Sequence, residues 1–135
     1  MGWIEPKTDW TSESYFNAED YNRIVGNVAH LTALRDTLFA LVKNIPSAEE
    51  KAVGSLIYAK EINAIEEAVA ALNLSTYNFD AGDQKDYMAN TKTIDWVELN
   101  RIEAVLLLLH DTMVAHKNAL HRLAFILGGE KGIRV

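Results

Sequence analysis

The sequence predicts an all-α fold: an antiparallel helical bundle of about four helices, with a long C-terminal helix and an extended aromatic N-terminal arm. Residues 96–127 carry apolar side chains at alternating spacings of three and four, and residues 18–43 and 59–72 show the same helical period. The chain has 135 residues, 49% of them hydrophobic, which is enough for one self-sufficient core. We therefore expect a single domain, residues 1–135.

The long C-terminal segment is the element around which the rest of the chain is expected to pack. Its apolar seam consists of Leu99, Ile102, Leu106, Leu109, Met113, His116, Leu120, Leu123 and Leu127. This heptad spacing indicates one helix, with Asp95 as its N-cap and Gly128 and Gly129 at its end. A second apolar stripe lies beside the seam, so more than one neighbour must cover the helix. Whether residues 120–127 are covered by this chain or by another copy stays open at this point.

Residues 1–16 show neither helical nor strand periodicity and are expected to form an extended arm. Its aromatic anchors are Trp3, Trp10, Tyr15 and Phe16. In the favoured interpretation these rings pack on the chain's own bundle. In the other, the arm docks on a neighbouring subunit, because Trp and Tyr dominate interface hot spots. These four aromatic residues are therefore the candidate interface residues.

The first helix is placed by the residues at its two ends. Asn17 followed by Asp20 forms a capping box, which predicts that the helix begins at residue 18. Pro46 disfavours helical geometry in the residue before it, so the helix is expected to end near residues 43–44.

The middle of the chain is less regular. Residues 47–50 repeat a capping-box pattern, which predicts that another helix begins there. The strong helical period resumes at residues 59–72. Residues 73–94 are expected to form an irregular connecting segment, with a tight turn at residues 80–83.

Three of the expected helices begin with the same short pattern, in which an acid and an apolar residue precede Asn, and Ile follows two positions later. The shared asparagines are Asn22, Asn63 and Asn100. Asn is a mediocre helix former, so its recurrence requires a cause. In the structural interpretation, each amide lies at the edge of the seam and hydrogen-bonds a loop or neighbouring helix, fixing the register. A ligand-binding cluster of three amides and chance are the alternatives.

Composition narrows the range of partners. The formal net charge is −6, with no basic stripe, so nucleic acid is not an expected partner. No cationic amphipathic face and no long apolar run point to a membrane. The chain has no cysteine and no visible signal peptide, so we expect it to be cytosolic when made.

The sequence shows no catalytic, cofactor-binding or metal-ligating constellation. Metal-binding histidines on one helix are spaced three or four residues apart, unlike those of the long helix, His110, His116 and His121. Glu-x-x-His pairs, Gly-rich phosphate loops and nucleophile motifs are also missing. His116, on the seam, is interpreted as a packed, hydrogen-bonded residue. We therefore expect a protein that is not an enzyme and uses no cofactor.

Several phrases of the sequence resemble those of one family. They are WIEPKTDW at residues 3–10, YFNAEDYNRI at residues 15–24, TIDWVELNRI at residues 93–102 and RLAFILGG at residues 122–129. With these phrases the chain resembles structural proteins encoded among the tail genes of phages and prophages of low-GC Gram-positive bacteria. The resemblance implies a non-enzymatic virion component of the tail or baseplate, and it assigns no functional residue.

These considerations lead to one main functional expectation. The chain is expected to be a phage or prophage structural protein that forms homo-oligomers and contacts other virion proteins or itself. Its location would be the virion, and the host cytoplasm during assembly. The alternative is a cytosolic helical adaptor or regulator that binds a helix of a partner protein. A small-molecule or metal-binding bundle is a third interpretation.

Overall fold

The structure, a computed structural model, describes residues 2–39, 51–52, 57–80, 82, 86–88 and 94–129. It contains α1 (Ala18–Leu38), α2 (Ala59–Leu74) and α3 (Trp96–Gly129). The predicted all-α class is confirmed, with three helices in the described part of the chain rather than about four. The further helix expected to begin at residues 47–50 lies outside the described residues.

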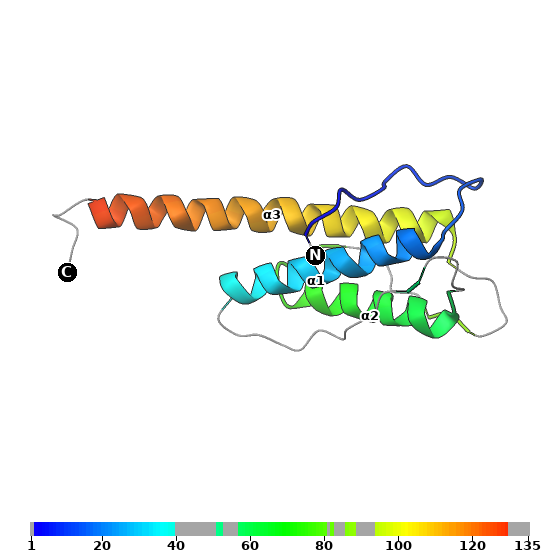
Figure 1. Ribbon diagram of the computed structural model, residues 1–135. Coiled ribbons are helices and arrows are strands. Elements are labelled where there is room, and N and C mark those ends of the chain that lie inside the picture. Colours follow the sequence, from blue (N-terminus) through cyan, green and yellow to red (C-terminus); the bar gives the residue numbers. More distant parts are fainter. Residues whose placement is uncertain are drawn as a thin grey trace.

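The three helices run in the same direction, so the expectation of an antiparallel bundle is wrong (Figure 1). Arg23 and His30 of α1 lie beside Glu103 and His110 of α3, so the residue numbers increase in the same direction along both helices. Near the other end of α1, Arg35 donates to Ser75, the C-cap of α2. The connections permit this arrangement, because α1 and α2 are each followed by roughly 20 residues, which can span about 66 Å when extended. That is enough to return the chain along a helix of about 32 Å to the end where the next one begins.

The helix ends confirm most of the capping predictions. Asn17 accepts a hydrogen bond from the backbone N–H of Asp20 at 3.0 Å, and the side chain of Asp20 accepts one from the N–H of Asn17. Asp95 accepts from the N–H of Glu98 at 3.0 Å. However, α1 ends at Leu38, earlier than predicted, because Phe39 adopts an extended conformation with ψ 133°. Its ring packs edge-on against Tyr77 and His116, so a tertiary contact accompanies the end of the helix.

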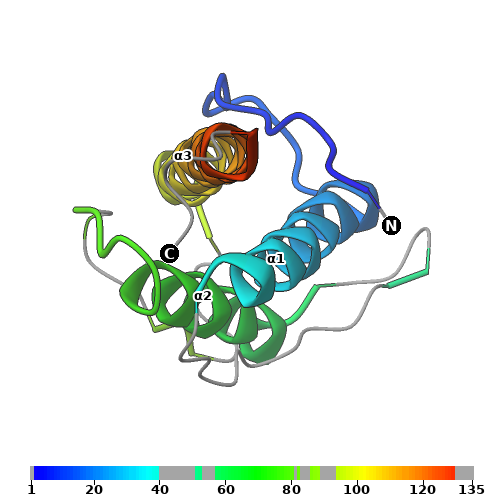
Figure 2. The ribbon, with the colours of Figure 1, turned by 90° about the vertical axis from the view of Figure 1, so that its left-hand side faces the viewer.

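The core lies between the facing sides of the three helices (Figure 2). The first five seam residues of α3 are all buried, and four of them have no exposed surface. They meet the apolar faces of the two shorter helices, Tyr21, Ile24, Val28 and Leu31 of α1 and Ile62, Ile65, Val69 and Leu72 of α2. The heptad pattern therefore predicted the core side of α3 correctly up to Met113.

Beyond His116, whose ring contacts Phe39 and Tyr77, α3 extends past the ends of α1 and α2 (Figure 1). We call residues 117–129 the overhang and the remainder of the described chain the body. Leu120 and Leu123 continue the seam but are 43% and 52% exposed. Phe125 is 81% exposed and Ile126 is 46% exposed. The described residues of this chain therefore leave the last turns of the seam uncovered.

The N-terminal arm is extended, as predicted, and runs along α1 and α3 (Figures 1 and 2). Trp10 is only 3% exposed and belongs to the core. In the irregular segment, Gly82 has φ +75°, a left-handed conformation in which a Cβ would lie 2.8 Å from the Cδ of Arg101. Asp80, at the start of the expected turn, accepts a hydrogen bond from the N–H of Gly82 at 3.2 Å, and residues 81 and 83 lie outside the described residues.

Candidate interaction surface

The three asparagines of the repeated pattern each hold an extended segment through its backbone. In every case the side-chain amide donates to the carbonyl of one residue and accepts from the N–H of the same residue. The pairs are Asn22 with Lys51 at 2.7 and 2.7 Å, Asn63 with Tyr87 at 2.8 and 2.7 Å, and Asn100 with Trp10 at 3.0 and 2.9 Å. Because these backbone groups are part-buried, each clamp satisfies a donor and an acceptor that would otherwise be left unpaired.

The clamps follow a cyclic order. Lys51 precedes α2 and is held by α1, and Tyr87 precedes α3 and is held by α2. Trp10 precedes α1 and is held by α3, which completes the cyclic order. Each helix thus holds the extended segment that leads into another helix. The shared sequence pattern marks three structurally equivalent helix starts.

Ion pairs repeat with the clamps. In α1 and α3 the residue after the clamping Asn is an arginine, and in α2 and α3 the residue three positions after it is a glutamate. Arg23 binds Glu103 with its Nη2 at 2.8 Å, and Arg101 binds Glu66. Both glutamates are essentially without exposed surface, so the guanidinium partners are needed to keep the buried charges compensated. The pairs join α1 to α3 and α3 to α2.

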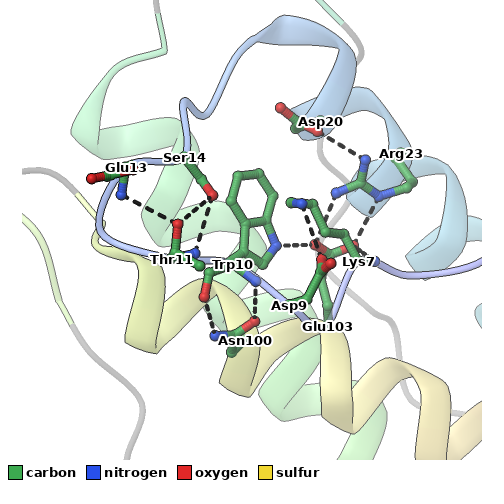
Figure 3. Close-up of polar contacts among 10 residues, drawn as sticks. All are labelled: Lys7, Asp9, Trp10, Thr11, Glu13, Ser14, Asp20, Arg23, Asn100 and Glu103. Carbon is green, nitrogen blue, oxygen red and sulfur yellow. Dashed lines mark hydrogen bonds and ion pairs between the residues drawn. The ribbon is translucent and has the colours of Figure 1, made fainter.

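The same glutamates also accept from the aromatic residues of the clamped segments. The indole N–H of Trp10 donates to Glu103, and the hydroxyl of Tyr87 donates to Glu66 at 3.3 Å. Figure 3 shows how Trp10 enters the space between Glu103, Asn100 and Arg23. Where α1 and α2 meet, the corresponding positions are Val25 and Ala64, so the third pair of the cycle is replaced by apolar side chains.

Further contacts complete the attachment of the arm. Asn27, without exposed surface, accepts from the N–H of Ile4 at 2.9 Å and donates to its carbonyl at 2.8 Å. The N–H of Lys7 donates to Glu103 at 3.1 Å. Sequence reasoning missed Asn27 and both buried glutamates. The recurrence of Glu three residues after Asn63 and Asn100 was the available signal.

Burial and pairing affect the ionisation of the groups around the clamps. Burial alone would lower the pKa of Arg23, but its bonds to Glu103 and Asp20 raise it. Burial, followed by the charge of Glu66, raises the pKa of Tyr87 above its usual value. Around neutral pH Arg23 therefore stays charged and Tyr87 stays protonated and neutral, so both can donate the hydrogen bonds described above.

The four aromatic residues named as interface candidates lie in different environments. Trp10 is in the core, and Phe16 packs against it with the ring centroids 5.9 Å apart. Trp3 is half-buried and stacks on His110 with the centroids 4.0 Å apart. Tyr15 is 89% exposed. The arm thus attaches to its own body, and of these four rings Tyr15 alone is freely accessible.

The histidines come together in ways that their spacing did not indicate. His30 and His110, from α1 and α3, lie with ring centroids 6.0 Å apart beside Trp3. His116 shares a hydrogen bond of 2.9 Å with the hydroxyl of Tyr77, which agrees with its interpretation as a packed residue. In the described part of the chain, no group of three or more metal-ligating side chains was found.

A half-open cavity of about 240 Å³ lies beside α2 and α3, lined by residues that include Glu66, Asn73, Phe79 and Arg101. Glu66 and Arg101 bind each other, and Asn73 holds both backbone groups of Phe79. These three polar side chains of the cavity lining are therefore engaged within the protein.

The overhang is an accessible apolar surface of α3, although Trp96, Val97, Leu108 and Val114 of the same helix are also exposed. Every described side chain from Lys117 to Ile126 is exposed, and the helix lacks a neighbour from the described body there.

Searches of family models, curated proteins and solved structures found no match to this chain. In the described residues, no helix is long and apolar enough to span a membrane.

Proposed function

We propose that the chain is a non-enzymatic structural component of a phage or prophage particle, associated with the tail or baseplate, that acts through contacts with other virion proteins and with itself. The observation that carries the proposal is the overhang, a projecting helix end with exposed Leu120, Leu123, Phe125 and Ile126. The association with phage follows from the resemblance of the sequence to tail-region proteins.

A projecting apolar helix is stabilised when another protein covers it. Removing a leucine side chain from water contributes roughly 1.5–3 kcal/mol, and contiguous exposed apolar patches mark contact sites in soluble proteins. The body, in contrast, has its extended arm and its buried charges held by internal hydrogen bonds. Such a division suits a protein whose body is a fixed support and whose helix end makes the contact.

The proposal is tested in the phage or prophage that encodes the chain. Particles are purified on a density gradient, and the chain is quantified in them by mass spectrometry. We expect the wild-type chain to sediment with the particles and the Leu123→Glu variant to be lost from them. Ala104→Glu is the matched control, because Ala104 is an exposed residue in the body half of the same helix. This variant should be incorporated like the wild type.

Two results would overturn the proposal. The wild-type chain could be missing from purified particles, or it could remain in the host cytosol bound to a non-virion protein. The second result would support the alternative role as an adaptor.

A further inference from the structure

Three aromatic rings from three segments meet where the beginning of the arm lies against α1 and α3. The indole of Trp3 stacks on the imidazole of His110, with the ring centroids 4.0 Å apart and the planes 4° from parallel. The ring of His30 lies tilted beside both, with its centroid 6.0 Å from each. We call Trp3, His30 and His110 the ring cluster. Histidine is the side chain whose ordinary pKa lies nearest to neutral pH, so the ring cluster can change its charge under mild conditions.

The indole of Trp3 is held less firmly than that of Trp10. The Nε1 of Trp3 is buried, and no described residue accepts a hydrogen bond from it. The indole N–H of Trp10, in contrast, donates to Glu103. A buried donor without a partner costs free energy that it regains in water. Of the two anchoring rings, Trp3 is therefore the one that leaves the body at the lower cost.

The charges around the ring cluster oppose a proton on His30. Burial is the largest cause that lowers the pKa of His30, and the positive charges of His110 and of the chain's amino group follow. His110 has the carboxylate of Asp111 beside it, 3.3 Å from its Nδ1, and the face of the Trp3 indole against its ring. Both neighbours favour a cation at this position. The ring cluster therefore accommodates one positive charge, on His110, and disfavours a second one on His30.

A second charge changes the balance between the closed ring cluster and an open form from which Trp3 has moved away. The two charged imidazoles would lie 6.0 Å apart, which is less than the Debye length of about 8 Å at physiological ionic strength. A charged His30 also requires water, and Trp3 packs beside it. When Trp3 leaves, water reaches both imidazoles and the indole N–H. The open form therefore binds the proton of His30 more tightly, and a falling pH favours it.

We propose that the ring cluster is a pH-dependent switch, which holds the beginning of the arm on α1 and α3 while His30 is neutral and releases Trp3 when His30 is protonated. The release is local, because Trp10 is attached separately through Asn100 and Glu103, without a histidine. Each unit by which the closed form lowers the pKa of His30 shifts the ratio of closed to open form about tenfold across the titration. The switch does not depend on the role proposed above.

The release of Trp3 can be observed in the full chain labelled with 5-fluorotryptophan. The three tryptophans give three fluorine NMR signals, and the Trp3→Phe variant assigns the signal of Trp3. Between pH 7.5 and pH 5 we expect this signal to move to the position of a solvent-exposed indole, while the signal of Trp10 stays in place. A constant Trp3 signal over this range, or Trp3 and Trp10 signals that move together, would overturn the proposal.

Substitutions of His30 separate its charge from the other effects of acid. His30→Gln cannot take up the proton and should keep Trp3 in the closed form down to pH 5. His30→Lys carries the charge throughout and should show the released signal already at pH 7.5. His121→Gln, at an exposed position of the overhang, is the matched control and should leave the transition unchanged. The same transition in a His30→Gln chain with wild-type helix content by circular dichroism would assign the opening to another group.

A reciprocal measurement leaves both histidines unchanged. Because the coupling between the proton and Trp3 acts in both directions, removing the indole must make His30 easier to protonate. NMR titration of the His30 imidazole should give a higher pKa in Trp3→Ala than in the wild type. Tyr15→Ala removes an exposed ring from the same arm and should leave this pKa unchanged. An equal pKa of His30 in Trp3→Ala and in the wild type would contradict the switch.

Discussion

The two halves of α3 share one heptad pattern and differ in what covers them. In the body half, Leu106 and Leu109 have no exposed surface, and Asn100 and Glu103 connect the helix to the arm and to α1. In the overhang, Leu120 and Leu123 are about half exposed. The residue types at the seam are the same, so the difference in burial is set by the lengths of α1 and α2. A helical period identifies a contact face, but the partner for each turn depends on the neighbours.

This contrast predicts that removing the arm, which belongs to the body, causes the largest loss in the free energy of unfolding. Deleting residues 1–12 removes the buried ring of Trp10, a loss of about 3–5 kcal/mol, and leaves the amide of Asn100 without its partner, at about 1–3 kcal/mol. Glu103 also loses the donors of Trp10 and Lys7, although it keeps its ion pair with Arg23. We expect the chain to unfold or to lose more than about 5 kcal/mol in urea titrations followed by circular dichroism. Tyr15→Ala, in the same arm but exposed, should change the free energy of unfolding by less than about 0.5 kcal/mol. An unchanged unfolding midpoint after the deletion would show that the arm is not part of the core.

The two halves of the seam can be compared directly with one type of substitution. Leu109→Ala should lower the free energy of unfolding by about 2–5 kcal/mol, because it leaves a cavity in the core. Leu123→Ala should lower it by less than about 0.5 kcal/mol when measured at a concentration at which the chain is monomeric. Similar losses for both variants would mean that the overhang is covered within the chain.

The asparagine clamps allow a comparison of intermediate size. Asn100→Ala leaves the part-buried N–H and carbonyl of Trp10 without their partners and should lower the free energy of unfolding by about 1–3 kcal/mol. Hydrogen exchange at the amide of Trp10 should also become faster. Asn118→Ala, at an exposed position of the overhang, is the control and should change stability by less than about 0.5 kcal/mol. Equal effects at both positions would contradict the clamp.

The smallest expected effect is a dependence on pH in the body. Burial, and then the charge of His110, lowers the pKa of His30. The unfolded chain therefore takes up this proton at a higher pH than the folded one. As a result, stability falls as pH decreases from about 6.5 towards the lower pKa of His30 in the folded state. His30→Gln should reduce this slope in urea titrations between pH 7.5 and pH 5, and His121→Gln, in the exposed overhang, should not. A slope unaffected by His30→Gln would assign the dependence to other groups.

Much of the local structure could be predicted from the sequence. The capping residues Asn17 and Asp95 and the seam up to Met113 depend on residues close together in the chain, and they were identified correctly. The shared position of Asn22, Asn63 and Asn100 was also visible, together with the expectation that these amides hydrogen-bond other segments. The sequence could not indicate that the partners are Lys51, Tyr87 and Trp10. A side-chain amide can hydrogen-bond the backbone N–H and carbonyl of any residue, so its presence does not identify the residue that it binds.

The sequence by itself determined where helices form and which face of each is apolar, since caps and helical period are properties of neighbouring residues. Only the tertiary structure decided that the helices run parallel, that the arm packs into the core of the same chain, and that α3 extends beyond the ends of α1 and α2. These features depend on the path of the long connections and on the relative lengths of the helices. Such quantities are fixed by the packing of segments distant in the sequence, and no local pattern encodes them.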